Sequence, residues 1–181
     1  VERHEGLLRF VRELIAFRAD KTLYLAAGER GLESNNGNAR ADGVQNANNT
    51  IGKVVRMARN GGSASVFSTG HRNPQGPAVV SGSNDLWLTE HGPQGGDELN
   101  RVTEGANYGW PVKSYGCNYG APVGEACRIS ADHSGYTEPK TYWAPTSTAP
   151  AGLAYYTGSG FPEWQGNLFS GALSGATLWR I

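Results

Sequence analysis

Short apolar stretches separated by polar turns recur three times along this chain of 181 residues. Each repeat begins with an apolar strand and a polar turn, followed by a second strand in which leucine stands beside an aromatic residue. A glycine-rich loop and a further short strand complete the repeat, which predicts an antiparallel meander. The predicted strands are 14–17, 23–25 and 50–57 in the first repeat, 78–80, 86–88 and 97–102 in the second, and 152–156, 167–169 and 176–181 in the third.

The wide spacing of these repeats predicts the architecture. Meanders that recur with long insertions are typical of β-propeller blades, whereas the strands of a sandwich are more evenly spaced. We therefore expect an all-β fold in one domain, residues 1–181, that supplies about three blades of a partial β-propeller. Because propellers close with about four to eight blades, the chain is expected to be a piece of a longer protein or to complete the ring as a homo-oligomer.

Three segments interrupt the strand pattern. Residues 7–17, LLRFVRELIAF, also fit an amphipathic helix with Leu7, Val11 and Leu14 on one face, so only residues 14–17 are assigned to a strand. Residues 30–49 are rich in asparagine, glycine and alanine, which predicts a polar surface loop. Residues 115–141 are expected to form another long loop.

Composition and charge narrow the function classes. Lysine plus arginine equals aspartate plus glutamate, 16 of each, so the formal net charge is zero. A general nucleic-acid binder or a protein that binds anionic membranes needs a basic excess and is not expected. No apolar run approaches the ~20 residues of a membrane span.

The two cysteines, Cys117 and Cys127, lie close together in a loop rich in glycine, asparagine and proline. Their spacing favours a local disulfide, which would indicate an oxidising compartment. Two free thiols are the alternative. The spacing does not match the CxxC pairs of zinc sites.

Three linked motifs carry the candidate chemistry: GHRNPQG at 70–76, LWLTEHGPQGGDELN at 86–100 and GANYGWP at 105–111. Glycine and proline at this density force the backbone into specific turns, and charged or amide side chains sit on those turns. Such loops on a rigid scaffold are typical of functional sites. From the residues alone, the simpler interpretation is that Arg72 pairs with a loop carboxylate while Asn73 and Gln75 cap turns.

These motifs, in this order and spacing, closely resemble the soluble aldose sugar dehydrogenases that depend on pyrroloquinoline quinone (PQQ), within the glucose/sorbosone dehydrogenase group. The resemblance covers about residues 14–181. It implies a six-bladed β-propeller with PQQ over the central axis and oxidation of the anomeric carbon of an aldose to a lactone. It also implies Ca²⁺ that polarises the quinone, an external electron acceptor, and a periplasmic or secreted protein.

The resemblance assigns residues to the two bound groups. Arg72, Asn73 and Gln75 would hold PQQ, whose carboxylates need cationic and hydrogen-bonding partners. Gly92 and Pro93 would bind Ca²⁺ through their backbone carbonyl oxygens, which suit a hard cation.

The catalytic base is assigned with less support from the pattern. The family base is a histidine in a short glycine-containing motif, which His4 alone matches, and Glu29 would orient its imidazole. The residues after Gly6 depart from the family pattern, and the interval to Glu29 is longer than usual. The alternative is that His4 is a frayed terminal residue without a catalytic role.

Further residues complete the predicted sugar and cofactor site. Trp143 would stack on a pyranose or, alternatively, pack within a blade. Ser147 and Thr148 would bind PQQ. His91 and Asp97 are placed near the sugar, with a loop histidine bonded to backbone and a carboxylate that supports the turn, binds Ca²⁺ or is solvated as their alternatives.

Two other functions remain open. A Ca²⁺-dependent propeller lactonase would share the carbonyl-bound metal but would have no use for the RNPQG motif. A catalytically degenerate propeller that binds a sugar or a protein partner would keep the loops and lack the base.

Overall fold

The computed structural model describes residues 14–29, 31, 43–60 and 62–181. The predicted base His4, the helical alternative over 7–13 and most of the loop 30–49 lie outside these residues. The described residues form three antiparallel β-sheets and two short 3₁₀ turns, Glu125–Cys127 and Pro162–Trp164. Neither turn has the length that a membrane-crossing helix needs.

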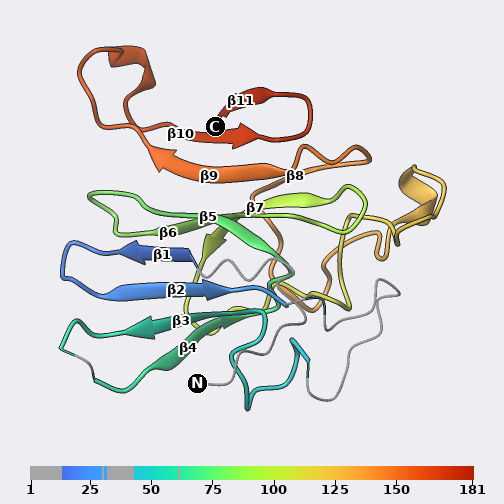
Figure 1. Ribbon diagram of the computed structural model, residues 1–181, viewed down its shortest axis with the longest axis horizontal. Coiled ribbons are helices and arrows are strands. Elements are labelled where there is room, and N and C mark those ends of the chain that lie inside the picture. The colour runs from blue at the N-terminus through green and yellow to red at the C-terminus, as the bar shows by residue number, and fades with distance from the viewer. Residues whose placement is uncertain (1–13, 30, 32–42, 61) are drawn as a thin grey trace, which may run out of the picture.

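The three sheets follow one another along the chain (Figure 1). In each sheet, strands that are consecutive in sequence pair antiparallel. The first sheet contains β1 Leu14–Phe17, β2 Leu23–Ala27, β3 Lys53–Met57 and β4 Ser65–Thr69. The second contains β5 Pro74–Val79, β6 Leu86–Glu90, β7 Asp97–Val102 and β8 Thr141–Trp143. The third contains β9 Pro150–Tyr155, β10 Leu168–Ala172 and β11 Thr177–Arg180.

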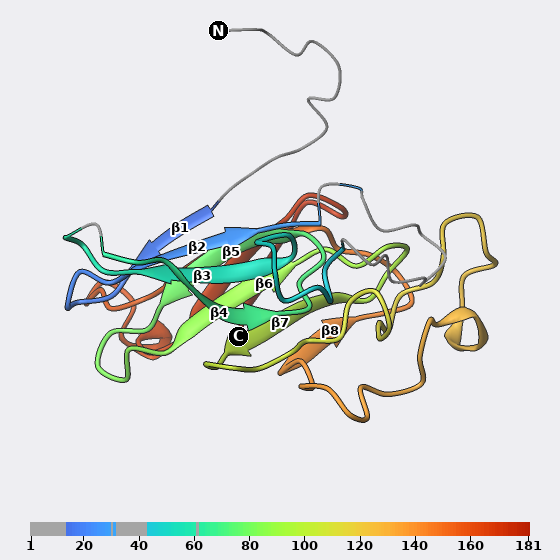
Figure 2. The ribbon, with the colours of Figure 1, turned by 90° about the horizontal axis from the view of Figure 1, so that it is seen from below.

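The first strands of the three sheets lie next to each other: β5 contacts β1 on one side and β9 on the other. Figure 2 shows the same sheets from below, turned relative to one another as the chain proceeds. Meanders whose first strands gather about a common line are blades of a β-propeller. The predicted all-β fold and its three blades are therefore confirmed.

Two strands were absent from the prediction. β4 reads SVFST, in which the two apolar residues are adjacent rather than alternating, and β8 reads TYW at the end of a long loop. Both are held by pairing with a neighbouring strand, β4 with β3 and β8 with β7. Short edge strands of this kind take their conformation from the ladder beside them rather than from their own side chains.

The core lies between the first two sheets. Tyr24, Val54, Phe67, Leu88 and Tyr108 belong to one cluster of buried side chains. The rings of Tyr24 and Phe67 meet edge to face with centroids 4.9 Å apart. Burying a large apolar side chain stabilises a fold by about 1.5–3 kcal/mol, so this cluster holds the two blades in a fixed relation.

One glycine brings two of the sequence motifs together. Gly70 has φ +84°, and a Cβ there would lie 2.5 Å from the backbone nitrogen of Gly109. The Gly70 carbonyl accepts the N–H of Trp110 at 3.1 Å. Only a residue without a side chain permits this approach. The start of GHRNPQG therefore lies directly against NYGWP.

Candidate functional site

The site is built at one end of the blades, where three connections meet. These are the β4–β5 turn at 70–73, the β6–β7 turn at 91–96 and the β8–β9 loop at 144–149. The Asn73 carbonyl accepts the N–H of His91 at 2.9 Å, and the Trp143 carbonyl accepts the N–H of Gly96 at 2.7 Å. These backbone bonds fix the three segments relative to one another.

Arg72 lies at the centre of this junction. Its Nη1 donates to the carbonyl oxygens of Gly92 at 2.6 Å and His91 at 3.1 Å. The guanidinium carbon lies 5.1 Å from the Trp110 ring centroid and 5.9 Å from that of Tyr119. The predicted cofactor arginine therefore touches the predicted metal-binding turn, and two aromatic rings flank its cation.

Asn73, Gln75 and His91 form a short chain of side chains. Gln75 Nε2 donates to Asn73 Oδ1 at 2.8 Å, and Asn73 Nδ2 lies 3.4 Å from His91 Nδ1. His91 Nε2 lies 2.9 Å from the Pro150 carbonyl, so this nitrogen carries the proton and Nδ1 accepts from Asn73. Burial lowers the pKa of His91, and this effect outweighs the charge of Asp97, which raises it. The ring is therefore neutral.

Asp97 joins two loops of the site. Its Oδ1 accepts the N–H of Gly92 at 3.0 Å. Its Oδ2 accepts from the Ser147 hydroxyl at 2.7 Å and from the backbone of Thr148 at 2.7 Å and Ala149 at 2.8 Å. The residue is 0% exposed. A carboxylate enclosed in this way has no face left for a sugar, which does not agree with the contact predicted for Asp97.

Ser147 and Thr148 are thereby placed as well. The Ser147 hydroxyl is taken up by Asp97, whereas Oγ1 of Thr148 is buried without a hydrogen-bond partner among the described residues. A buried hydroxyl without a partner is costly unless something binds to it. Of the two, Thr148 has the side-chain oxygen that remains available.

Glu29 is buried beside Arg72. Its N–H donates to the Arg72 carbonyl at 2.8 Å, and its Oε2 lies 3.4 Å from Nε1 of Trp110. The predicted partner of the base therefore belongs to the same junction, although His4 itself lies outside the described residues. Trp110 contacts both Glu29 and Arg72.

A buried polar chain supports Arg72 from behind. Glu90 accepts the Arg72 N–H at 2.9 Å, the His71 Nδ1–H at 2.9 Å and the Asn100 amide at 2.8 Å. Burial opposes ionisation of Glu90, but the charge of His71 and these hydrogen bonds outweigh it and lower its pKa. Glu98 shares the Asn100 amide at 3.1 Å. Burial and the charge of Glu90 raise the pKa of Glu98 well above its usual range.

All members of this chain lie within the motifs at 70–76 and 86–100, but the sequence did not predict that their side chains meet. The signal that could have found it is the alternation in β6 and β7. Glu90 stands at the end of β6, with Glu98 and Asn100 two residues apart on β7, and Glu90 and Glu98 are direct partners in the ladder. Two carboxylates on paired positions of an inner sheet must share protons or donors.

Trp143 lies at the end of β8, and its ring packs against that of Trp179, with centroids 5.7 Å apart. This geometry matches the packing alternative. Pro93 is buried in the β6–β7 turn and lies against Gly116, where an added Cβ would come within 2.8 Å of the proline ring.

Comparison with known proteins defines the class. The sequence profile of the Glucose / Sorbosone dehydrogenase family matches residues 9–181. The chain belongs to this family.

Individual relatives agree with that assignment. The chain is 39% identical over 173 residues to the aldose sugar dehydrogenase YliI of Escherichia coli K12, which covers 88% of this chain and 44% of the relative. A solved glucose dehydrogenase superposes with a TM-score of 0.77 at 37% identity, covering 93% of this chain and 49% of that one. The PQQ-bound aldose sugar dehydrogenase of Streptomyces coelicolor gives 0.66 at 31% identity, covering 92% and 43%. The chain thus spans less than half the length of each relative, in keeping with three blades of a six-bladed ring.

Proposed function

We propose that the protein to which this chain belongs oxidises aldose sugars at the anomeric carbon to lactones, with PQQ as hydride acceptor and Ca²⁺ polarising the quinone. The observation that carries this proposal is the contact of Arg72 with the Gly92 carbonyl. It joins the predicted cofactor motif to the predicted metal turn within one small junction. Membership of a sugar dehydrogenase family and the PQQ-bound relative support the same reaction.

The residues present fit a polyanionic cofactor. Arg72 offers a half-buried planar cation, and its Nε is buried without a partner among the described residues. Oγ1 of Thr148 is a second such atom. Buried donors without partners are what carboxylates and quinone oxygens would satisfy. Arg72, Asn73 and Thr148 would hold PQQ, which supplies the electrophilic carbon that accepts hydride.

Ca²⁺ would be bound through main-chain oxygens. No group of three or more histidine, cysteine or acidic side chains suited to a metal occurs in the described part of the chain. The carbonyls of Gly92 and Pro93 are hard oxygen ligands. Asp97 accepts the Gly92 N–H and so fixes the orientation of this turn.

The proton of the sugar hydroxyl requires a base. His91 is unsuited to this role because its Nε2–H donates to Pro150 and its Nδ1 accepts from Asn73, so both nitrogens are engaged. We retain His4 as the base, with buried Glu29 orienting its imidazole and stabilising the imidazolium.

The setting of the reaction follows from the disulfide. Cys117 and Cys127 are bonded in the structure, as the loop composition predicted. A disulfide persists in an oxidising environment. We therefore place the protein in the periplasm or outside the cell, where an external acceptor would reoxidise the cofactor.

The test uses the full-length protein supplied with PQQ and Ca²⁺. Reduction of an artificial electron acceptor by an aldose, lost in R72A and in the absence of PQQ, is the expected result. Saturable PQQ binding without turnover would instead indicate the degenerate binding propeller. Cleavage of a lactone without PQQ would indicate the hydrolase.

A further inference from the structure

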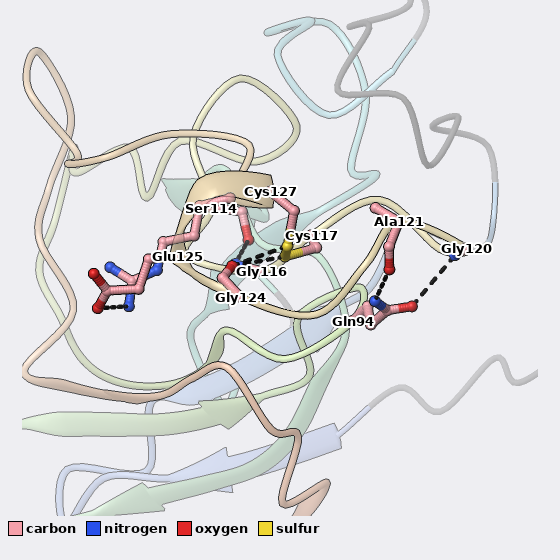
Figure 3. The surroundings of a disulfide bond; sticks show 10 residues. Gln94, Ser114, Gly116, Cys117, Gly120, Ala121, Gly124, Glu125 and Cys127 are labelled. Atoms are coloured by element: carbon pink, nitrogen blue, oxygen red, sulfur yellow. Dashed lines mark hydrogen bonds and ion pairs between the residues drawn. A yellow bond between two sulfur atoms is a disulfide. The ribbon is translucent and has the colours of Figure 1, made fainter.

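The loop closed by the disulfide Cys117–Cys127 is hydrogen-bonded to the turn that follows Gly92. Gln94 and Cys117 exchange two backbone hydrogen bonds, of 3.1 and 3.0 Å. The Gln94 side chain adds two more, donating to the Ala121 carbonyl at 2.7 Å and accepting the Gly120 N–H at 3.3 Å (Figure 3). The disulfide loop is therefore fastened to the β6–β7 turn at two places.

These hydrogen bonds between the disulfide loop and the β6–β7 turn position Tyr119 next to Arg72. The Tyr119 hydroxyl lies 3.5 Å from Arg72 Nη2, and its ring centroid lies 5.9 Å from the guanidinium carbon. The two separations lie at the outer limits of a hydrogen bond and of a cation–π contact, about 3.5 Å and about 6 Å, so Tyr119 borders Arg72 without being tightly held by it.

Tyr119 remains 56% exposed although it contacts a half-buried cation. An aromatic ring that leaves much of its surface uncovered next to the central cation of a site is placed to cover a ligand that binds this cation. Trp110, by contrast, is 3% exposed and forms the buried side of the same arginine.

We propose that Tyr119 is a ligand-binding residue that packs against the flat ring system of PQQ held by Arg72, and that the segment 117–127 serves to position it. The inference rests on the proposed function. A phenol ring is electron-rich and a quinone is electron-poor, so offset stacking between them is favourable. The disulfide and Gln94 limit the freedom of the loop, which lowers the entropy lost when Tyr119 packs on the ligand.

The experiment measures PQQ affinity of the full-length protein in the presence of Ca²⁺, by calorimetry, independently of turnover. Y119A should weaken binding by about threefold to thirtyfold, and Y119F should bind within about twofold of the wild type because it keeps the ring. The matched control is V123A, which changes a 59% exposed residue of the same loop and should leave the affinity unchanged.

The double variant C117S/C127S keeps Tyr119 and frees the loop, and it should also weaken binding. Equal affinity of Y119A and wild type, with both proteins folded by circular dichroism, would overturn the inference alone. A wild-type protein that binds no PQQ would overturn the proposed function and the inference with it. A loss in V123A as large as that in Y119A would assign the effect to the loop as a whole and reject the specific role of Tyr119.

Discussion

Asp97 accepts the backbone N–H of Gly92 at 3.0 Å from a fully buried position at the start of β7. The second oxygen of the same carboxylate holds the chain at 147–149. One side chain thus connects the turn that presents the Gly92 carbonyl with the loop that presents Thr148. The two predicted binding elements are therefore linked through one buried carboxylate.

Replacement of Asp97 by asparagine should destabilise the protein by about 2–4 kcal/mol, because an amide places its own N–H groups toward backbone donors that need an acceptor. Urea unfolding measures this free energy. D85N is the control, since Asp85 forms an exposed ion pair with Arg101 at 2.9 Å and such pairs contribute at most about 1 kcal/mol. Similar losses in the two variants would contradict the role given to Asp97.

Gly92 should not tolerate alanine. A Cβ at this position would lie 2.2 Å from the Gly95 carbonyl oxygen and 2.5 Å from that of Gly96. The backbone of the turn must shift, at a cost of about 1–3 kcal/mol, so G92A should lower the melting temperature. G62A provides the comparison, because the nearest atom to its Cβ would be the Asn60 Oδ1 at 3.5 Å. An unchanged melting temperature in G92A would show that the turn is not closely packed.

The raised pKa of Glu98 predicts that stability falls as the pH rises. In the folded protein this carboxyl keeps a proton that the unfolded chain releases near its ordinary pKa of 4.5. Its contribution is therefore complete below that pH and is lost as the pH approaches the folded pKa. E98Q cannot release a proton, so its melting temperature should depend less on pH between about pH 5 and about pH 8 than that of the wild type.

The control for this prediction is E104Q, which alters an exposed glutamate paired with Arg56 at 2.7 Å. It should leave the pH dependence of the wild type unchanged. A wild-type profile that is flat over this range would contradict the neutral state assigned to Glu98.

Reduction of the disulfide should lower stability without unfolding the blades. The bond links residues separated by 10 positions, and closing a loop of this length restricts the unfolded chain by about 2–3 kcal/mol. Melting curves with and without reductant measure the difference. C117S/C127S should melt at the temperature of the reduced wild type and should not respond to reductant; a further drop on reduction would show that reductant acts elsewhere.

Periodicity was sufficient to predict the blades because apolar residues at alternate positions must face a core. Leu86 and Leu88, at alternate positions of β6, are both buried, as strand spacing requires. β4 and β8 escaped prediction because their conformation depends on a partner strand. The helix-like pattern over 7–17 resolves as strand over 14–17. The described part of the loop 30–49 is not simply surface, since Val44 is 0% exposed.

The site residues that belong to the linked motifs could be predicted from the sequence. The contacts between residues far apart along the chain could not, because they depend on the fold. Arg72, Asn73 and Gly92 come together as expected because their motifs occupy neighbouring turns. The burial of Asp97 could not be foreseen, since three of its four donors come from residues 50 positions or more away along the chain. Tyr119 had no signal in the sequence beyond its place between two cysteines.

The residues of the site differ in how closely they are tied to the strands of the blades. Arg72, Glu90 and Asp97 lie at strand ends or in short turns, where a substitution also disturbs the hydrogen bonding between strands. Tyr119 instead lies in the loop closed by the disulfide, outside the strands of the blades. A substitution of Tyr119 would therefore alter how tightly the cofactor is held while leaving the blades themselves unchanged.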